Sequence, residues 1–265
     1  MADPMNTEQP ISLPNGPLEG EHRLGALRGQ AWLTVQTRQA QQLIRGRTGT
    51  TDKPAIIGLV GFADRLRVIW QAARNDDPYA HWWLIKVHEA IEQARVFVRT
   101  RQSELDSQLE QVAGIEMTVA ESLRPYRVPL QFANPYAYRG AQMLAEYDTL
   151  VRTLLTGCHV SLLDRESSEK VINLSARKIR GTFVVPQGYR FLGIDRELLQ
   201  QGSDKKEQAR QLMGDLPDEV LSGKHRAPLL PRNVQFPKEI ARSVVLEPLT
   251  STSSRSHPEG GGDNG

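Results

Sequence analysis

The sequence predicts a mainly α-helical protein with one or two short β-strands. Three observations support this fold class. Apolar residues recur every three or four positions over four long stretches, which is the spacing of a helix face. Only two short stretches alternate apolar with polar residues, as strands do. The chain of 265 residues is 39 % hydrophobic and 24 % charged, a composition that allows a sizeable buried core.

Three parts of the chain differ in composition. Residues 1–22 contain several Pro and Gly residues and few apolar ones, so we expect a disordered N-terminal segment. Residues 23–227 carry the helical and strand patterns and predict a single mostly helical domain with an N-terminal β-ribbon. Residues 228–265 are first Pro-rich and then Ser/Gly-rich, which predicts an extended segment followed by a disordered tail.

The first strand is predicted at residues 31–37, and a short helix-like run follows at 39–45. If Leu33 and Val35 face the core, the polar residues that alternate with them face the other way. These outward-facing residues are Thr34, Gln36 and Arg38.

A helix is predicted next, at residues 54–74. Pro54 suits the first turn of this helix, and Asp52 is a candidate cap just before it. Its apolar face consists of Ile56, Leu59, Ala63, Leu66 and Trp70. The helix should end at the acidic run 75–78, which closes with a proline.

A long helix follows at residues 79–112 and would extend for about 50 Å. Such a helix needs a partner along its length, from this chain or from another. The acids Asp76 and Asp77 suit the positive end of the helix dipole, and Pro78 suits the first turn. The aromatic residues that we expect to anchor this turn are Tyr79, Trp82 and Trp83. A ligand pocket is the alternative interpretation of the same string.

The second half of the chain is predicted to contain one strand and further helices. Residues 127–132 alternate, but Pro129 restricts them to an edge or first position of a sheet. The predicted helices are 136–156 with Gly157 as its C-cap, 165–180 with Asp164 as its N-cap, and 205–213, followed by a turn at 217–221.

Several function classes find no support in the sequence. The one cysteine, Cys158, allows no internal disulfide, and we expect a protein of the reducing cytoplasm. His88 and Glu92 lie one helical turn apart, a spacing that a metal site could use but that more often gives a surface pair. There is no phosphate-binding glycine motif, no membrane-length apolar run and no secretory signal. We therefore expect no catalytic residue, no metal and no cofactor, and the prediction is a non-enzymatic protein.

Positive charge gathers near the predicted ribbon. Residues 23–53 hold six Lys or Arg residues against Asp52 alone. A two-stranded ribbon fits the major groove of double-stranded DNA, where outward Thr, Gln and Arg side chains can contact base edges. The predicted base-contacting residues are Thr34, Gln36 and Arg38, and the predicted phosphate-contacting residues are Arg28, Arg45, Arg47 and Lys53. An edge strand with an ordinary polar face is the alternative. The basic run 177–180 could also bind phosphate, or it could simply complement a helix dipole.

Six strings resemble a family of proteins encoded on integrating conjugative elements of proteobacteria. They are the segments at 23–28, 33–40, 53–59, 76–84, 188–193 and 213–217. That family in turn looks like a distant relative of the AcaB-like transcriptional regulators, which are associated with ribbon-helix-helix DNA binding. The resemblance implies a homodimeric regulator of mobile-element genes, with a ribbon-helix-helix-like element embedded in a larger helical body.

Two segments could form this element. The first is the strand at 32–37 with helices near 39–46 and 54–74, and the second is the strand at 127–132 with helices 136–156 and 165–180. We favour the first, because its outward face is richer in groups that contact DNA. The competing function is a scaffold protein of element transfer or maintenance, which binds partners through its long helices.

Overall fold

The fold is described from a computed structural model of the chain, which places residues 30–52, 55–111, 117–201 and 204–231. The predicted N-terminal segment 1–22 and nearly all of 228–265 lie outside these residues. So do Arg28 and Lys53, two of the predicted phosphate contacts.

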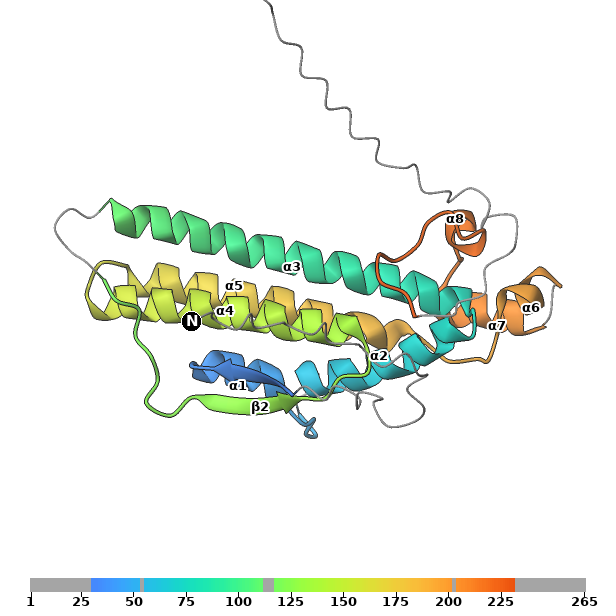
Figure 1. Cartoon of the computed structure of the whole chain (residues 1–265), viewed down its shortest axis with the longest axis horizontal. Coiled ribbons are helices and arrows are strands. Elements are labelled where there is room, and N and C mark those ends of the chain that lie inside the picture. The colour runs from blue at the N-terminus through green and yellow to red at the C-terminus, as the bar shows by residue number, and fades with distance from the viewer. Residues whose placement is uncertain (1–29, 53–54, 112–116, 202–203, 232–265) are drawn as a thin grey trace, which may run out of the picture.

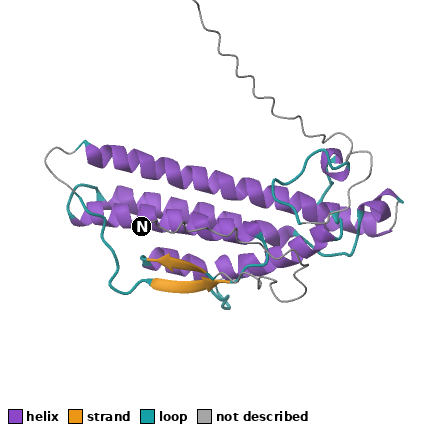
Figure 2. Cartoon of the chain, in the orientation of Figure 1, coloured by secondary structure: helices purple, strands orange, loops and turns teal. Residues whose placement is uncertain are grey.

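Helices dominate the structure, and two short strands lie side by side (Figure 2). The elements in chain order are β1 (Ala31–Val35), α1 (Arg38–Arg45), α2 (Leu59–Arg74), α3 (Pro78–Glu110), β2 (Tyr126–Leu130), α4 (Pro135–His159), α5 (Arg165–Val184), the 3₁₀ turn η1 (Val185–Gly188), α6 (Arg196–Gln200), α7 (Asp204–Met213) and α8 (Asp218–Leu221). The predicted mainly α fold with short strands is confirmed.

The elements form layers around the long helix α3. Helices α4 and α5 run beside α3 and form the middle of the molecule, and α1 and the two strands lie on the far side of them (Figure 1). Helix α2 runs from that side to the start of α3 and contacts α3 directly. The short helices α6, α7 and α8 gather at the end where α3 begins (Figure 1).

The core identifies the partner that the long helix needs. Buried apolar residues of α3 from Tyr79 to Leu105 belong to one apolar cluster with residues of α2, α4 and α5. Val96 is the one large apolar residue of α3 that is exposed, and α3 lies wholly within the described residues. The apolar stripe of α3 is therefore covered by its own chain.

Polar side chains begin the main helices as the sequence predicts. The Asp77 carboxylate accepts hydrogen bonds from the backbone N–H groups of Tyr79 and Ala80, at 2.9 and 3.1 Å. Asp164 accepts one from the N–H of Ser167 at 2.7 Å. These caps satisfy donors that a first turn leaves without a partner inside the helix.

The predicted start of the second helix is wrong. Helix α2 begins at Leu59 instead of residue 54, and Asp52 lies in a bend and does not cap it. The reason is a backbone pairing between Arg47 and Ile56, whose N–H and C=O groups exchange two hydrogen bonds of 2.8 Å. This pairing keeps Ile56 extended, so the chain turns into the helix only at Gly58.

The predicted cap at Gly157 is also wrong. Helix α4 continues to His159, and Val160 is its C-cap. Gly157 is buried inside the helix, where a Cβ atom would lie 2.5 Å from Cδ1 of Leu163. The glycine is needed there because the α4–α5 turn packs onto the helix.

Candidate nucleic-acid interface

The two predicted strands pair with each other. β1 and β2 form a two-stranded antiparallel sheet in which Ala31 is opposite Leu130 and Val35 is opposite Tyr126. A single chain thus builds a ribbon from the strands of both candidate segments. Each strand has one edge with no strand partner among the described residues. Pro129 of β2 has no N–H group to donate.

The inner face of the ribbon packs on the helices. Leu33 and Val35 are buried, as the alternation predicts, and Val128 and Leu130 pack against the same core. Apolar residues at every second position therefore fix which face of the ribbon meets solvent.

The outer face of the ribbon carries an exposed aromatic and cationic pair. Thr34 is exposed and lies opposite Arg127, and Trp32 lies opposite Pro129. The guanidinium carbon of Arg127 lies 4.5 Å from the centre of the Trp32 ring. Sequence reasoning left both Trp32 and Arg127 out of the site. Exposed and half-buried residues alternate over 126–130, and the pairing of β1 with β2 then puts Trp32 and Arg127 on the same outer face of the ribbon.

Asp148 of α4 fixes the corner where β1 ends. Its buried carboxylate accepts hydrogen bonds from the N–H of Gln36 at 2.7 Å and from the N–H and hydroxyl of Thr37 at 2.9 and 2.6 Å. Thr37 in turn caps α1, since its hydroxyl accepts from the N–H of Ala40. One carboxylate therefore anchors both the ribbon and α1 to the helical core.

Because the chain turns at this corner, the three predicted base-contacting residues do not all lie on β1. β1 ends at Val35, so the alternation does not continue to Gln36 and Arg38. The side chain of Gln36 is half-buried, and its Oε1 accepts a hydrogen bond from the N–H of Ser122 at 3.0 Å. The expectation that Thr34, Gln36 and Arg38 share one strand face is therefore wrong, because Arg38 is the first residue of α1.

Helix α1 places two of the predicted arginines on one face. Arg38 and Arg45 are both exposed and are seven positions apart, so they lie on the same side of the helix, about 10 Å apart along its axis. Arg45 also lies over the ring of Tyr126 on β2, at 5.0 Å. Arg47 is exposed just beyond the helix.

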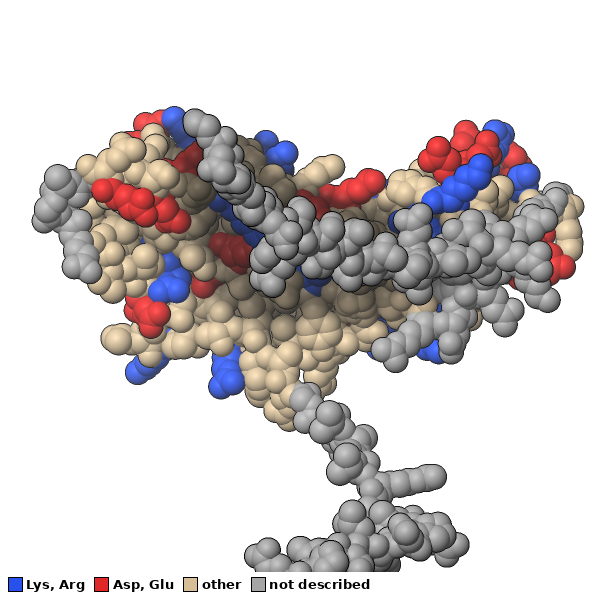
Figure 3. Space-filling model, turned by 45° about the horizontal axis from the view of Figure 1, so that its top comes forward, with Lys and Arg blue, Asp and Glu red and all other residues tan. Residues whose placement is uncertain are grey.

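Positive charge dominates the described residues of this region. Segments 30–52 and 117–132 contain five arginines, all exposed, which are Arg38, Arg45, Arg47, Arg124 and Arg127. Their two acids are Asp52 and Glu121, and Glu121 forms an ion pair with Arg152 at 3.1 Å. Figure 3 turns the top of the molecule and α3 toward the viewer, and there acidic and basic side chains are interspersed. The ribbon region is thus more uniformly basic than that face.

The acidic and aromatic string at the start of α3 has a structural role. The buried Asp77 caps the helix and also accepts a 2.6 Å hydrogen bond from the hydroxyl of Tyr189. Burial raises the pKa of Asp77 despite these bonds. Lys86, one turn beyond Trp82, lies over the rings of Trp82 and Trp83, at 3.2 and 3.8 Å. The interpretation of this string as a helix anchor is supported by these contacts.

A buried arginine completes this region. Arg196 forms an ion pair with Asp76 at 2.8 Å and donates to the carbonyl oxygens of Val220 and Leu221. It also lies 3.2 Å from Nδ1 of His81. Because a guanidinium can only donate, Nδ1 accepts and Nε2 carries the proton that is directed at Ala73 O, 3.1 Å away. Burial lowers the pKa of His81 to about 4, so this histidine is neutral.

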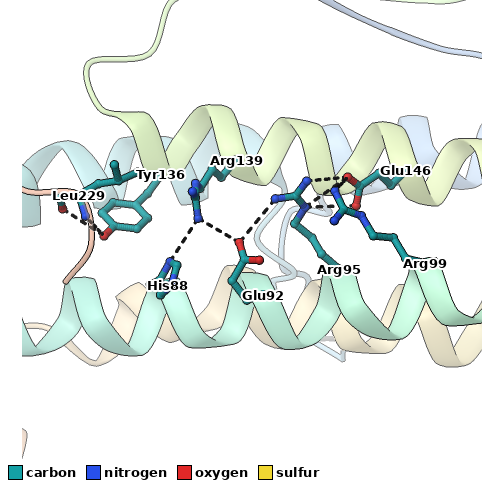
Figure 4. A network of polar contacts seen from close by, with 8 residues as sticks. All are labelled: His88, Glu92, Arg95, Arg99, Tyr136, Arg139, Glu146 and Leu229. Carbon is teal, nitrogen blue, oxygen red and sulfur yellow. Dashed lines mark hydrogen bonds and ion pairs between the residues drawn. The ribbon is translucent and has the colours of Figure 1, made fainter. Parts of the chain in front are cut away.

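His88 and Glu92 do not pair with each other as a surface couple; both contact Arg139 of α4 (Figure 4). Arg139 Nη1 lies 3.4 Å from Nδ1 of His88 and 3.0 Å from Oε1 of Glu92. Nearby, Glu146 accepts from Arg95 and Arg99 at 2.7 and 2.6 Å. These contacts join α3 to α4. In the part of the chain that is described, no cluster of three His, Cys, Asp or Glu residues could hold a metal ion.

The family model described as "Transcriptional regulator AcaB" matches residues 23–233. The chain belongs to the AcaB family. The match includes the ribbon, α1 and the whole helical body, so the AcaB family of transcriptional regulators accounts for nearly all the described residues.

One solved AcaB structure is similar to this chain. The crystal structure of selenomethionine-containing AcaB from uropathogenic E. coli aligns with 74 % of this chain and 95 % of its own, at 12 % sequence identity and a TM-score of 0.48. A search of curated proteins found no match. Within the described residues, no helix has both the length and the hydropathy that spanning a bilayer requires.

Proposed function

We propose that this AcaB-family protein regulates transcription by binding double-stranded DNA with its ribbon and α1, as a cytoplasmic homodimer encoded on an integrating conjugative element. The chemistry is binding alone, and the proposal requires no catalytic residue, metal or cofactor. The observation that carries it is the set of five exposed arginines in segments 30–52 and 117–132. The two acids of these segments are Glu121, which is paired with Arg152, and Asp52.

The ribbon has the two-stranded antiparallel form that suits a DNA groove. A two-stranded antiparallel ribbon fits the major groove, and its outward side chains then meet base edges. Thr34 and Arg127 occupy this position, with Arg127 held over the Trp32 ring. Thr can bond to several bases, and Arg binds guanine with two hydrogen bonds. We therefore add Arg127 to the predicted base contacts Thr34 and Arg38.

The remaining arginines suit phosphate contacts. Arg45 lies at the edge of the ribbon, where its guanidinium is oriented by the ring and hydroxyl of Tyr126. Arg47 follows two positions later, beyond the end of α1, and Arg28 and Lys53 complete the predicted set outside the described residues. Contacts of this kind position a protein on the duplex and make binding salt-dependent. Gln36 holds the ribbon corner by accepting a hydrogen bond from the N–H of Ser122, and its contact with a base stays a prediction.

The homodimer is proposed through β1. β1 contains no proline, whereas Pro129 leaves β2 one N–H donor short, so we expect a second copy to add more readily to β1. Such a pairing is two-fold symmetric and would place two ribbons on one DNA site. The scaffold function remains the alternative, to be favoured if DNA binding lacks sequence specificity.

Fluorescence anisotropy tests the proposal. The full chain is titrated against duplex fragments from upstream regions of its own element and against scrambled duplexes, at salt concentrations from about 50 to 200 mM. We expect one fragment to bind about 10³-fold or more tightly than its scrambled partner at physiological salt. Equal affinity for both, lost together as salt rises, would show phosphate attraction alone and overturn the proposal. Sedimentation equilibrium of the free protein tests the homodimer.

A further inference from the structure

A pocket of about 380 Å³ lies between α1 and α5, close to the ribbon. Helix α1 contributes Gln39 and Gln42, and α5 contributes Asn173 and Arg180. Arg47 lines its wall, and Tyr147 of α4 reaches it from the core. The volume is within the range of pockets that bind small molecules.

The charged groups of this pocket all have one sign. The pocket is lined by two arginines and by no aspartate or glutamate. Arg47 and Arg180 are far apart in the sequence, so the two basic stretches that the sequence singled out meet only in the folded protein. Within the described residues, Arg180 takes part in no ion pair. A half-buried guanidinium without a carboxylate partner favours a bound anion.

The rest of the lining suits an organic molecule. The side-chain amides of Gln39, Gln42 and Asn173 can each donate and accept hydrogen bonds. The apolar surface comes from Leu43, Ile172 and Ala176, all buried. A few polar groups around an apolar base are typical of sites for small ligands.

We propose that this pocket binds a small organic anion with two or more negative charges, carried by phosphate or carboxylate groups, between Arg47 and Arg180. The proposal goes beyond DNA binding and does not depend on it. Both guanidiniums bind the charged end of the ligand, and the three amides bind its polar groups.

The pocket lies on a different side of α1 from the Arg38 and Arg45 face proposed for DNA, and Arg47 is the residue that the two proposed sites share. Gln39, Gln42 and Leu43 lie on one face of α1, while Arg38 and Arg45 lie about a quarter turn around the helix. A DNA backbone on the Arg38 and Arg45 face would not fill the concave space on the α5 side. A small molecule fits that space better than a duplex does.

Isothermal titration calorimetry of the full chain tests the site with two probes, pyrophosphate for phosphate groups and citrate for carboxylates. At least one should bind with a Kd below about 1 mM, as a pair of charge-assisted contacts allows. Arg180→Gln should weaken that binding about tenfold or more. Asn173→Asp, an exposed change that adds a negative charge to the pocket, should weaken it as well. The probe that binds identifies the charged group.

The matched control is Arg177→Gln, on the same helix and exposed but outside the pocket lining, and it should keep wild-type affinity. Binding of neither probe at about 10 mM, or an equal loss in Arg177→Gln and Arg180→Gln, overturns the proposal. DNA affinity is measured for the same variants. If Arg180→Gln weakens DNA binding and no probe binds, Arg180 is a phosphate contact of DNA instead. If pyrophosphate or citrate binds but DNA binding lacks sequence specificity, the anion site is supported and only the proposed DNA-binding function is overturned.

Discussion

The hydroxyl of Thr37 donates a 2.6 Å hydrogen bond to the carboxylate of Asp148, 111 positions further along the chain. The same carboxylate also accepts from two backbone N–H groups, those of Gln36 and Thr37. Asp148 is only 4 % exposed, so these three donors replace the water that its charge would otherwise bind. Asp148 therefore adds a polar anchor to the apolar contacts that hold the ribbon on the helical core.

Asp148→Ala should lower the free energy of unfolding by about 3 kcal/mol or more. The substitution leaves buried donors at Gln36 and Thr37 without an acceptor, which costs more than the lost bonds alone. Urea denaturation followed by circular dichroism measures the change. Asp64→Ala, at an exposed position of α2, is the control and should change stability little. Equal effects of the two substitutions would contradict the proposed anchor.

The protein should lose stability as the pH falls below about 6.5 because of His81. Its pKa is about 4 in the folded protein and 6.5 in an unfolded chain, so the unfolded state takes up a proton first. The loss should reach about 2 kcal/mol between pH 7.5 and pH 5. Asp76 and Asp77 oppose it at lower pH, since burial raises both of their pKa values and the folded state then takes up protons.

Denaturation curves at several pH values compare three proteins. His81→Gln should lose stability overall but show a flatter dependence on pH between 7.5 and 5, because the titrating group is gone. His159→Gln, at an exposed position, should keep the wild-type slope. An unchanged slope in His81→Gln would assign the pH dependence to other groups.

Two glycine substitutions should have opposite effects. Gly46 has φ of +71°, and a Cβ atom there would lie 2.3 Å from the carbonyl oxygen of Ile56, so Gly46→Ala should destabilise by about 2 kcal/mol or more. Gly181 lies in α5 with nothing within 4 Å of a Cβ, so Gly181→Ala should stabilise by about 0.5–1 kcal/mol. Thermal denaturation of both variants measures the two effects, and a stable Gly46→Ala protein would contradict the close approach to Ile56.

Arginine substitutions should separate base contacts from phosphate contacts. Arg38→Ala and Arg127→Ala should each weaken specific DNA binding by about 1–3 kcal/mol, because each removes a base-reading group. Arg45→Ala should weaken binding to specific and scrambled duplexes alike and reduce the salt slope by about 1. Arg165→Ala, exposed on α5, is the control. Anisotropy titrations measure all four, and wild-type affinity in Arg127→Ala would remove the ribbon face from the site.

Local patterns in the sequence predict most of the helices and both strands. Caps such as Asp77 and Asp164 act within a few residues, so they can be recognised without the fold. The start of α2 could not be predicted, because it depends on the pairing of Arg47 with Ile56. The site was predicted in part: Thr34 and Arg45 lie on or beside the ribbon, whereas Arg127 joins them only through the pairing of β1 with β2.

The ribbon also sets an order of events during synthesis. Its two strands are roughly 90 to 100 positions apart in the sequence, with α1, α2 and α3 between them. β1 leaves the ribosome early and must wait for Tyr126–Leu130 before it can pair, and for Asp148 before its corner is anchored. During that interval Leu33 and Val35 have neither sheet nor core to cover them. A chain released before α4 would therefore expose an unpaired apolar strand to its neighbours, and ribosomal arrest products that end near residue 125 should aggregate or recruit chaperones, whereas products that include α4 should not.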